Sequence, residues 1–140
     1  MNIIKLLIPK CFIAYLESQN TLRQGLEKMR SHGYTAIPVI TKEGVYVGTI
    51  REGDFLWNII DRDETEMKSL EKISIKDLIH RDFNPPVHIS SSMKELLERA
   101  KNQNFVPVVD DRGFFVGIIT RKDIITYFCD NYLEDSEQDK

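Results

Sequence analysis

The chain has 140 residues, 41% of them apolar, and a formal net charge of −3. Basic residues are interspersed with acidic ones and form no cluster, which argues against nucleic-acid binding, since that needs a basic face. A chain of this length and apolar content forms one domain with a core, or two half-domains that share a core.

Residues 2–8 are apolar apart from Asn2 and Lys5, and they are too few to span a bilayer. Because a secretory cleavage site is also missing, we expect this segment to pack on the domain or on a second copy, in a cytoplasmic protein with no membrane partner. Cys11 and Cys129 show no metal-binding or redox spacing, which predicts buried or half-buried free thiols in a reducing compartment. The three histidines indicate neither a metal site nor a catalytic triad.

The first half of the chain predicts the order strand, helix, strand, strand and helix, over residues 12–16, 21–33, 34–40, 45–50 and from 51 onward. Thr21 and Gln24 form a capping pair at the start of the first helix, and Gly33 ends it. The charged stretch 61–74 follows, and we expect it to be an exposed and partly helical connector.

The second half predicts the order short helix, extended segment, helix, strand, strand and helix, over residues 74–78, 87–89, 92–100, 105–109, 114–119 and about 121–129. Ser74 with Asp77 and Ser92 with Glu95 are the capping pairs that start the first two of these helices. The acidic run 134–139 predicts a solvated tail.

The two halves repeat each other. The matching residues lie 69 positions apart and are Pro38 and Pro107, Gly44 and Gly113, Gly48 and Gly117, and Asp54 and Asp123. Further upstream the offset is 71, as from Thr21 to Ser92. Each half is too small to bury both faces of a three-stranded sheet, so we expect the halves to pack face to face about a pseudo-twofold axis.

Thr120, Arg121 and Asp123 follow a predicted buried strand, at the start of the last helix. N–H groups at a helix start attract anions, and a carboxylate accepts hydrogen bonds from a pair of sugar hydroxyls. The turn is therefore suited to a ribose and a phosphate. The alternative is a capping pair, Thr120 with Asp123, that needs no ligand.

The repeated motif resembles the CBS domain (cystathionine-β-synthase domain) in tandem, a pair known as a Bateman module. The motif consists of residues 34–39 with Gly44, Gly48 and Asp54, and of residues 105–110 with Gly113, Gly117, Thr120 and Asp123. The resemblance implies an α+β fold with mixed sheets. Two CBS repeats of about three strands and two helices, residues 9–60 and 80–130, are joined by a connector at 61–79 and followed by an acidic C-terminal tail at 131–140.

Members of this family bind adenosine-containing ligands, and the resemblance implies that each site lies across the pseudo-twofold axis. The base lies against the first two strands of one repeat, and the ribose and phosphate lie at the turn of the other repeat. Carried onto this chain, the favoured nucleotide-binding site is formed by Ala14, Tyr34, Thr35, Ala36, Pro38, Thr120, Arg121 and Asp123. Small side chains at Thr35 and Ala36 leave room for a flat purine to approach the backbone.

The resemblance implies a second nucleotide-binding site, formed by Val87, Asn104, Phe105, Val106, Arg51 and Asp54. This site departs from the family pattern, because Arg51 replaces a threonine and Phe105 stands where the first repeat has Ala36. Arg51 either grips a phosphate or fills the pocket together with Phe105.

Residues 33–38, with Thr120 and Arg121, are also similar to small stand-alone bacterial members that bind cyclic di-AMP where two pockets meet in a dimer. That subgroup commonly places a lysine in the first strand, where this chain has Phe12. We therefore expect a ligand like AMP, ADP or ATP, with cyclic di-AMP as the alternative.

The sequence predicts a non-catalytic regulatory module, because it contains no nucleophile–base pair, metal cluster or phosphate-binding glycine loop. The adenine nucleotide is then a regulatory ligand, no cofactor is required, and an effector protein reads the response. Trp57, Tyr127 and Tyr132 predict a homodimer surface, unless Trp57 packs under the connector. The alternative from another class is a ligand-free dimerisation module in which Asp54 and Asp123 only cap helices.

Overall fold

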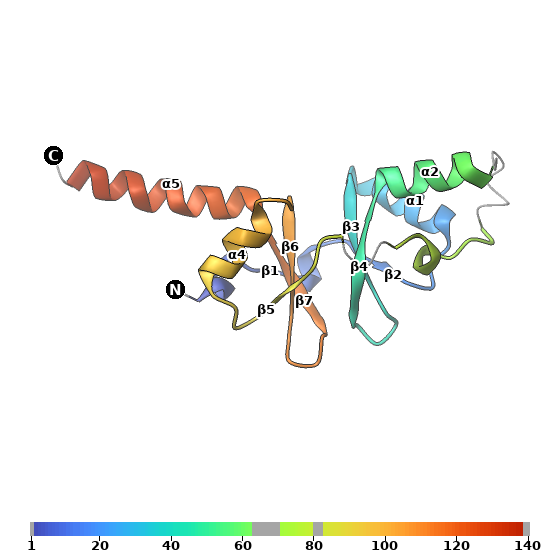
Figure 1. Cartoon of the computed structure of the whole chain (residues 1–140), viewed down its shortest axis with the longest axis horizontal. Coiled ribbons are helices and arrows are strands. Elements are labelled where there is room, and N and C mark those ends of the chain that lie inside the picture. The colour runs from blue at the N-terminus through green and yellow to red at the C-terminus, as the bar shows by residue number, and fades with distance from the viewer. Residues whose placement is uncertain (1, 63–70, 80–82, 139–140) are drawn as a thin grey trace.

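The computed structural model describes residues 2–62, 71–79 and 83–138, and the chain forms two similar halves, each a small mixed sheet with helices on its outer side (Figure 1). The first sheet has the order β2-β3-β4, from Leu16–Glu17, Ala36–Ile40 and Tyr46–Arg51. The second has the order β1-β7-β6-β5, from Ile8–Pro9, Phe115–Thr120, Phe105–Val109 and Val87–His88. The predicted α+β class is confirmed.

The helices are α1 (Leu22–His32), α2 (Glu52–Arg62), α4 (Met93–Ala100) and α5 (Arg121–Gln138). The Thr21 hydroxyl accepts a hydrogen bond from the Gln24 amide, and the Gln24 side chain accepts one from the Thr21 amide, so the predicted capping box is present. Gly33, in the left-handed conformation at φ 68°, ends α1. Ser92 caps α4 through the amide of Glu95.

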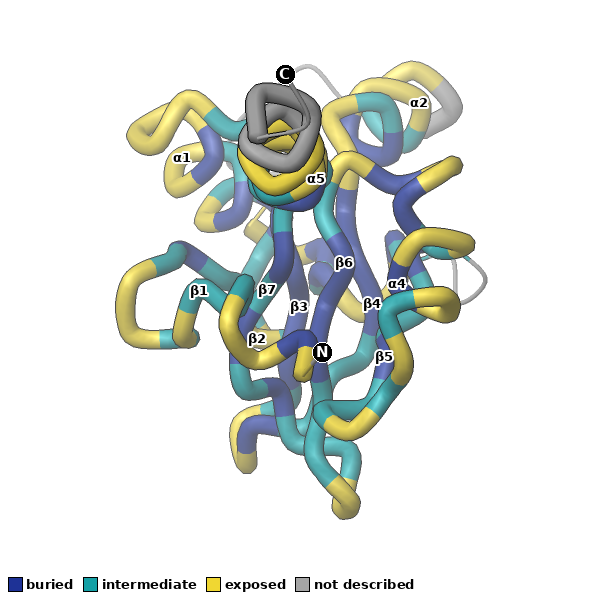
Figure 2. The backbone as a smooth tube through the Cα atoms, turned by 90° about the vertical axis from the view of Figure 1, so that its left-hand side faces the viewer, coloured by how far each residue is buried: buried dark blue, intermediate teal, exposed yellow. Residues whose placement is uncertain are grey.

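Each half has its own apolar core between its sheet and its helices. The first core contains Leu16, Leu22, Met29, Ile37, Val39, Ile50 and Phe55, and the second contains Val87, Leu96, Val106, Val108, Ile119 and Ile124. Figure 2 shows the central strands buried and the outer turns of the helices exposed. The strands that carry the repeated motif therefore form the buried middle of the molecule.

The tips of the β3–β4 and β6–β7 hairpins meet between the halves. The amide of Tyr46 donates a hydrogen bond to the carbonyl of Gly113 over 3.1 Å, and the amide of Phe115 donates one to the carbonyl of Gly44 over 2.9 Å. The 69-residue offset exchanges these two bonds, because it relates Gly44 to Gly113 and Tyr46 to Phe115. The expected pseudo-twofold axis therefore passes between the hairpin tips.

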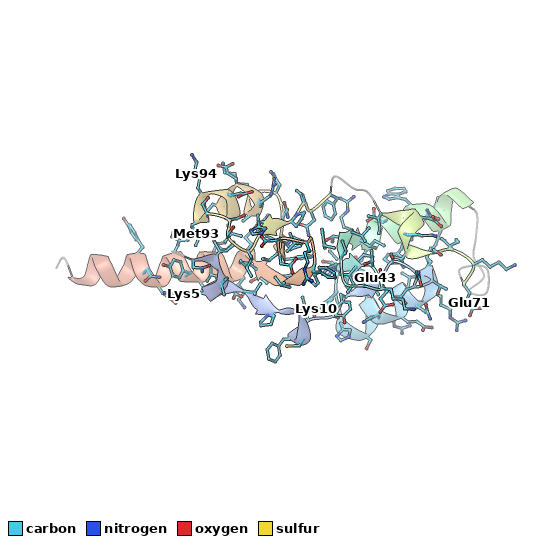
Figure 3. The ribbon with its side chains drawn as sticks, turned by 90° about the horizontal axis from the view of Figure 1, so that it is seen from below. Lys5, Lys10, Glu43, Glu71, Met93 and Lys94 are labelled. Atoms are coloured by element: carbon cyan, nitrogen blue, oxygen red, sulfur yellow. The ribbon has the colours of Figure 1, made fainter. Side chains whose placement is uncertain are left out.

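Each half is completed by the segment that leads into the other half. The 3-10 helix η1 (Ile3–Leu6) and β1 stand in sequence before the sheet and helices of the first half, but Ile3 is buried in the second core and β1 pairs with β7. Conversely, the 3-10 helix η3 (Ile75–Leu78) stands in sequence before the sheet and helices of the second half and packs into the first core. Figure 3 shows Lys5 beside the second half and Lys10 at the junction, where the N-terminal segment crosses over.

Two equivalent glycines make room for these crossing segments. A Cβ atom at Gly117 would overlap the carbonyl oxygen of Ile8, and one at Gly48 would lie 2.6 Å from the Cγ2 atom of Ile79. Ile8 and Ile79 are themselves related by the upstream offset of 71. The two close approaches therefore fall at equivalent positions on the two sides of the axis, one against a backbone oxygen and the other against a side-chain methyl group.

Two predicted elements differ from the structure. Residues Lys10–Phe12 form a 3-10 helix, and only Leu16–Glu17 pairs with β3, so the strand predicted at 12–16 is wrong. The last helix continues to Gln138, well past the predicted end near Cys129, and takes in most of the predicted tail. Residues 63–70 of the predicted connector lie outside the described residues.

Two side-chain predictions are also wrong. Ser74 makes no side-chain cap on η3, where the amide of Asp77 donates instead to the Ser74 carbonyl over 3.1 Å. Cys11 and Cys129 are free thiols as predicted, but both are exposed rather than buried.

Candidate functional site

A cavity of about 490 Å³ opens between the two halves, within the usual size range of a small-molecule site. Its walls come from the chain before β2, from the start of β3 and from the facing strands β6 and β7. Six of the eight residues of the favoured site line it, namely Ala14, Tyr34, Thr35, Ala36, Pro38 and Thr120. The structure thus brings both repeats together around one cavity.

Arg121, predicted at the same site, does not line this cavity. Its Nε atom donates to the carbonyl of Ala100 over 2.8 Å, and its Nη2 atom donates to the carbonyl of Lys101 over 3.4 Å, at the end of α4. Arg121 and Lys122 do line a neighbouring hollow of about 430 Å³, which shares Asn104 with the cavity. Positive charge therefore lies beside the cavity rather than inside it.

Asp123 is also absent from the cavity lining, but its carboxylate is unengaged. Its amide donates to the Thr120 hydroxyl over 3.1 Å, which caps α5. The carboxylate itself, half-buried, has no hydrogen-bond or ion-pair partner in the part of the chain that the structure describes. An unpaired carboxylate one helical turn from the lining residue Thr120 is suited to accept hydrogen bonds from a ligand.

The cavity has further lining residues that were missed or assigned elsewhere by the sequence: Ile8, Phe12, Ile13, Gly33, Asn104, Phe105 and Ile118. Strand geometry contains a signal for two of them. Ile118 lies two residues before Thr120 and so shares its face of β7, and Phe105 lies opposite Thr120 in the β6–β7 register. Phe12 has no such signal; its side chain is 77% exposed at the cavity.

The residues of the second predicted site are not gathered around a comparable cavity. Val87 and Val106 are at most 1% exposed, and Asn104 and Phe105 line the first cavity instead. The Arg51 guanidinium lies 3.9 Å from the centre of the Phe83 ring.

Asp54, the acid of the second site, is engaged by its own turn. Its carboxylate accepts a hydrogen bond from the Arg51 amide over 2.8 Å and pairs with the Arg51 guanidinium at 3.5 Å. These contacts favour a self-contained turn over a ribose-binding one.

Two like halves closed about a pseudo-twofold axis over a shared cavity define a tandem-repeat module. Residues 8–61 and 73–130 each match the CBS domain model, and the chain therefore belongs to the CBS-domain family. Both repeats predicted from the sequence are thus confirmed.

Among characterised relatives, cyclic di-AMP receptor B of Bacillus subtilis is 27% identical over 113 residues, which cover 81% of this chain and 76% of the receptor. The crystal structure of CbpB from Streptococcus agalactiae is 26% identical, with a TM-score of 0.81 over 96% of this chain and 83% of that chain. A structure of CbpB in complex with c-di-AMP has the same fold, with a TM-score of 0.88 at 24% identity over 100% of this chain and 91% of that chain.

Other kinds of site were sought in the same residues. Within the described ranges, histidine, cysteine, aspartate and glutamate form no group of three or more that could hold a metal ion. Among the helices described, none combines the length and the apolar character needed to cross a bilayer.

Proposed function

We propose that this protein is a non-catalytic regulatory module that binds an adenosine-containing nucleotide in the cavity between its repeats and signals to a partner protein. The observation that carries the proposal is the cavity itself. It is lined from both repeats, and it adjoins the start of α5, where the Asp123 carboxylate has no hydrogen-bond or ion-pair partner among the described residues.

The wall chemistry suits a nucleoside. Ala14, Thr35 and Ala36 are small, so a purine ring can approach the backbone, while Ile13 and Ile118 supply apolar surface for its faces. A ribose at Thr120 lies within reach of the Asp123 carboxylate, which can accept bonds from two hydroxyls. A phosphate that leaves the cavity past Asn104 meets the hollow lined by Arg121 and Lys122, where Coulomb attraction favours it.

We propose cyclic di-AMP as the ligand to test first. The Bacillus subtilis relative is named as a receptor for it, which outweighs the sequence-based preference for a mononucleotide. A cavity of about 490 Å³ suits one nucleoside monophosphate, so the second half of a cyclic dinucleotide would project past the exposed Phe12. In a homodimer, the partner subunit can complete that half of the site.

Signalling requires that the ligand bind one arrangement of the repeats better than another, because equal binding shifts no equilibrium. A homodimer, an effector protein and a cytoplasmic location stay predictions. Trp57 and Tyr132 are 63% and 75% exposed, which supports the dimer surface.

Thermal unfolding in the presence of AMP, ADP, ATP, S-adenosylmethionine and cyclic di-AMP tests the proposal, since a ligand that binds only the folded state raises Tm. We expect a saturable rise with cyclic di-AMP, confirmed by calorimetric titration. A rise with a mononucleotide alone would reject cyclic di-AMP but keep the nucleotide site. No rise with any of the five, and no adenine absorbance released from acid-precipitated protein, would favour the ligand-free dimerisation module.

A further inference from the structure

The pseudo-twofold axis generates a second cleft, whose lining can be compared with the open cavity position by position. Phe12, Ile13 and Ala14 correspond to Phe83, Asn84 and Pro85 at the offset of 71. Tyr34, Ile118 and Thr120 correspond to Gln103, Thr49 and Arg51 at the offset of 69. The apolar Ile13 and Ile118 of the open cavity are thus replaced by an amide and a hydroxyl.

These replacements form a closed hydrogen-bond cluster of Tyr46, Thr49, Asn84 and Gln103. The Tyr46 hydroxyl donates to the Asn84 carbonyl over 2.8 Å and lies 2.8 Å from the Thr49 hydroxyl, which accepts from the Asn84 amide over 3.0 Å. The Gln103 amide donates to the Asn84 side-chain oxygen and, over 3.3 Å, to the Pro85 carbonyl. Thr49, Asn84 and Gln103 are at most 6% exposed, and burial raises the pKa of Tyr46.

The mouth of this cleft is also occupied. Arg51, which stands where the open cavity has Thr120, has its guanidinium carbon 3.9 Å from the centre of the ring of Phe83, the counterpart of Phe12. The hollow that is left nearby has only about 280 Å³, and all its lining residues come from the second repeat. It therefore lacks the opposite-repeat turn that a shared nucleoside site needs.

We propose that the hydrogen-bonded side chains of Tyr46, Thr49, Asn84 and Gln103 fill the second cleft in place of a ligand, so that each chain binds one nucleotide. The same cluster holds the two repeats together on the closed side. The proposal rests on the proposed function for its ligand. A nucleoside entering this cleft would break several satisfied buried hydrogen bonds and leave their polar groups unpaired, which opposes its binding. Asn84 holds its place in the left-handed conformation at φ 61°, which asparagine tolerates better than most residues.

The test follows the side-chain amide protons of Asn84 and Gln103 by NMR, during titration with AMP and, separately, with cyclic di-AMP. We expect slow hydrogen exchange of both amides in the free protein and at saturation, with no more than one nucleotide bound per chain by calorimetry. Thr120→Arg places in the open cavity the residue found at the equivalent position of the closed cleft, and Ala36→Phe places there the bulky residue that β6 has at the equivalent position, Phe105. Each should abolish binding while both amides stay protected.

A second bound nucleotide per chain, or binding that survives both blocking variants with loss of amide protection, would overturn the proposal. Fast exchange in the free protein would overturn it without any ligand. If neither nucleotide binds while the amides stay protected, the proposed function is rejected, but the inference that the side-chain cluster closes the second cleft is retained.

Discussion

Asp54 and Asp123 occupy equivalent positions, but their surroundings have diverged. In the first turn the carboxylate of Asp54 accepts from the backbone of Arg51 and pairs with its side chain. In the second turn the Thr120 hydroxyl caps the helix, and the Asp123 carboxylate makes no hydrogen bond or ion pair with the described part of the chain. The carboxylate of the first turn is satisfied by its own turn, whereas that of the second turn can accept hydrogen bonds from a ligand.

Asp123→Ala should therefore weaken nucleotide binding, and Asp54→Ala is its matched control. Loss of hydrogen bonds to a charged group corresponds to about a 10- to 100-fold rise in Kd for Asp123→Ala. Asp54→Ala should leave Kd within about threefold but lower the free energy of unfolding by about 0.5–2 kcal/mol, because it removes a helix cap. Calorimetric titration and urea unfolding measure the two effects, and equal losses of affinity would contradict the assignment of the open site.

Gly117→Ala should destabilise the protein by about 1–3 kcal/mol, because the new methyl group overlaps the backbone of Ile8 and one strand must shift. Gly53→Ala is the matched control. Its Cβ atom would have no neighbour nearer than the Trp57 ring at 3.7 Å, so the better helix propensity of alanine should leave stability unchanged or raise it by up to about 1 kcal/mol. Urea unfolding distinguishes the two, and similar free energies of unfolding would show that β1 does not lie against β7.

Among individual residues, the sequence predicted best those that lie on strands aligned by the internal repeat. Thr35, Ala36 and Thr120 could be assigned because the resemblance to the CBS domain carries its binding-site positions onto them, and the repeat fixes the register of the strands on which they lie. Arg121 could not, because its hydrogen bonds to the end of α4 depend on how α4 packs beside β6. Phe12 lies in a 3-10 turn whose direction is set by the crossing of the N-terminal segment, for which no local pattern exists.

At the scale of elements, η1 illustrates how a short segment can stabilise a distant core. Ile3 is 0% exposed in the second core, whereas the adjacent Ile4 is 44% exposed. Ile3→Ala should lower the free energy of unfolding by about 2–5 kcal/mol, through lost burial and the cavity left behind. Ile4→Ala should change it by about 0.5 kcal/mol, as is usual at the surface. Urea unfolding of both variants measures the difference, and equal effects would mean that η1 does not contribute to the core.

The elements that the sequence predicted well are those with a periodic pattern of apolar residues or a helix-capping motif. The β3–β4 and β6–β7 hairpins follow their apolar strands and glycine turns, and α1 follows its capping box. The two-residue strands β2 and β5 are defined by pairing with β3 and β6, so their bounds depend on partners far along the chain. The length of α5 was underestimated because an acidic run was read as a tail, although glutamate and glutamine are good helix formers and no glycine or proline interrupts it.

At the scale of the whole molecule, α2 and α5 are related by the pseudo-twofold axis and both expose apolar side chains. Leu56, Trp57 and Ile60 are exposed on α2, and Ile125, Phe128 and Tyr132 on α5. Tyr127, predicted with them, is half-buried and packs edge-on against Phe128. These two stripes are where we expect a second copy to dock.

Trp57→Lys should therefore weaken the dimer, since a buried tryptophan at an interface typically contributes at least about 2 kcal/mol, roughly 30-fold in Kd. Lys42→Glu, in the exposed turn between β3 and β4 at the far end of the molecule from these helices, should leave the dimer intact (Figure 1). Sedimentation velocity over a range of concentrations measures both. If the wild-type protein is monomeric at every concentration, the predicted homodimer is wrong.

The crossing of η1 and η3 makes neither half self-sufficient. A molecule with one repeat would leave part of its apolar core exposed to solvent until a second molecule supplied the equivalent of η1 or η3. Its folding would therefore depend on protein concentration. Tethering the two repeats in one chain replaces that encounter with an intramolecular one, at an effective concentration in the millimolar range for a short flexible linker. The halves should consequently unfold together, in a single transition whose midpoint does not vary with dilution of the monomer.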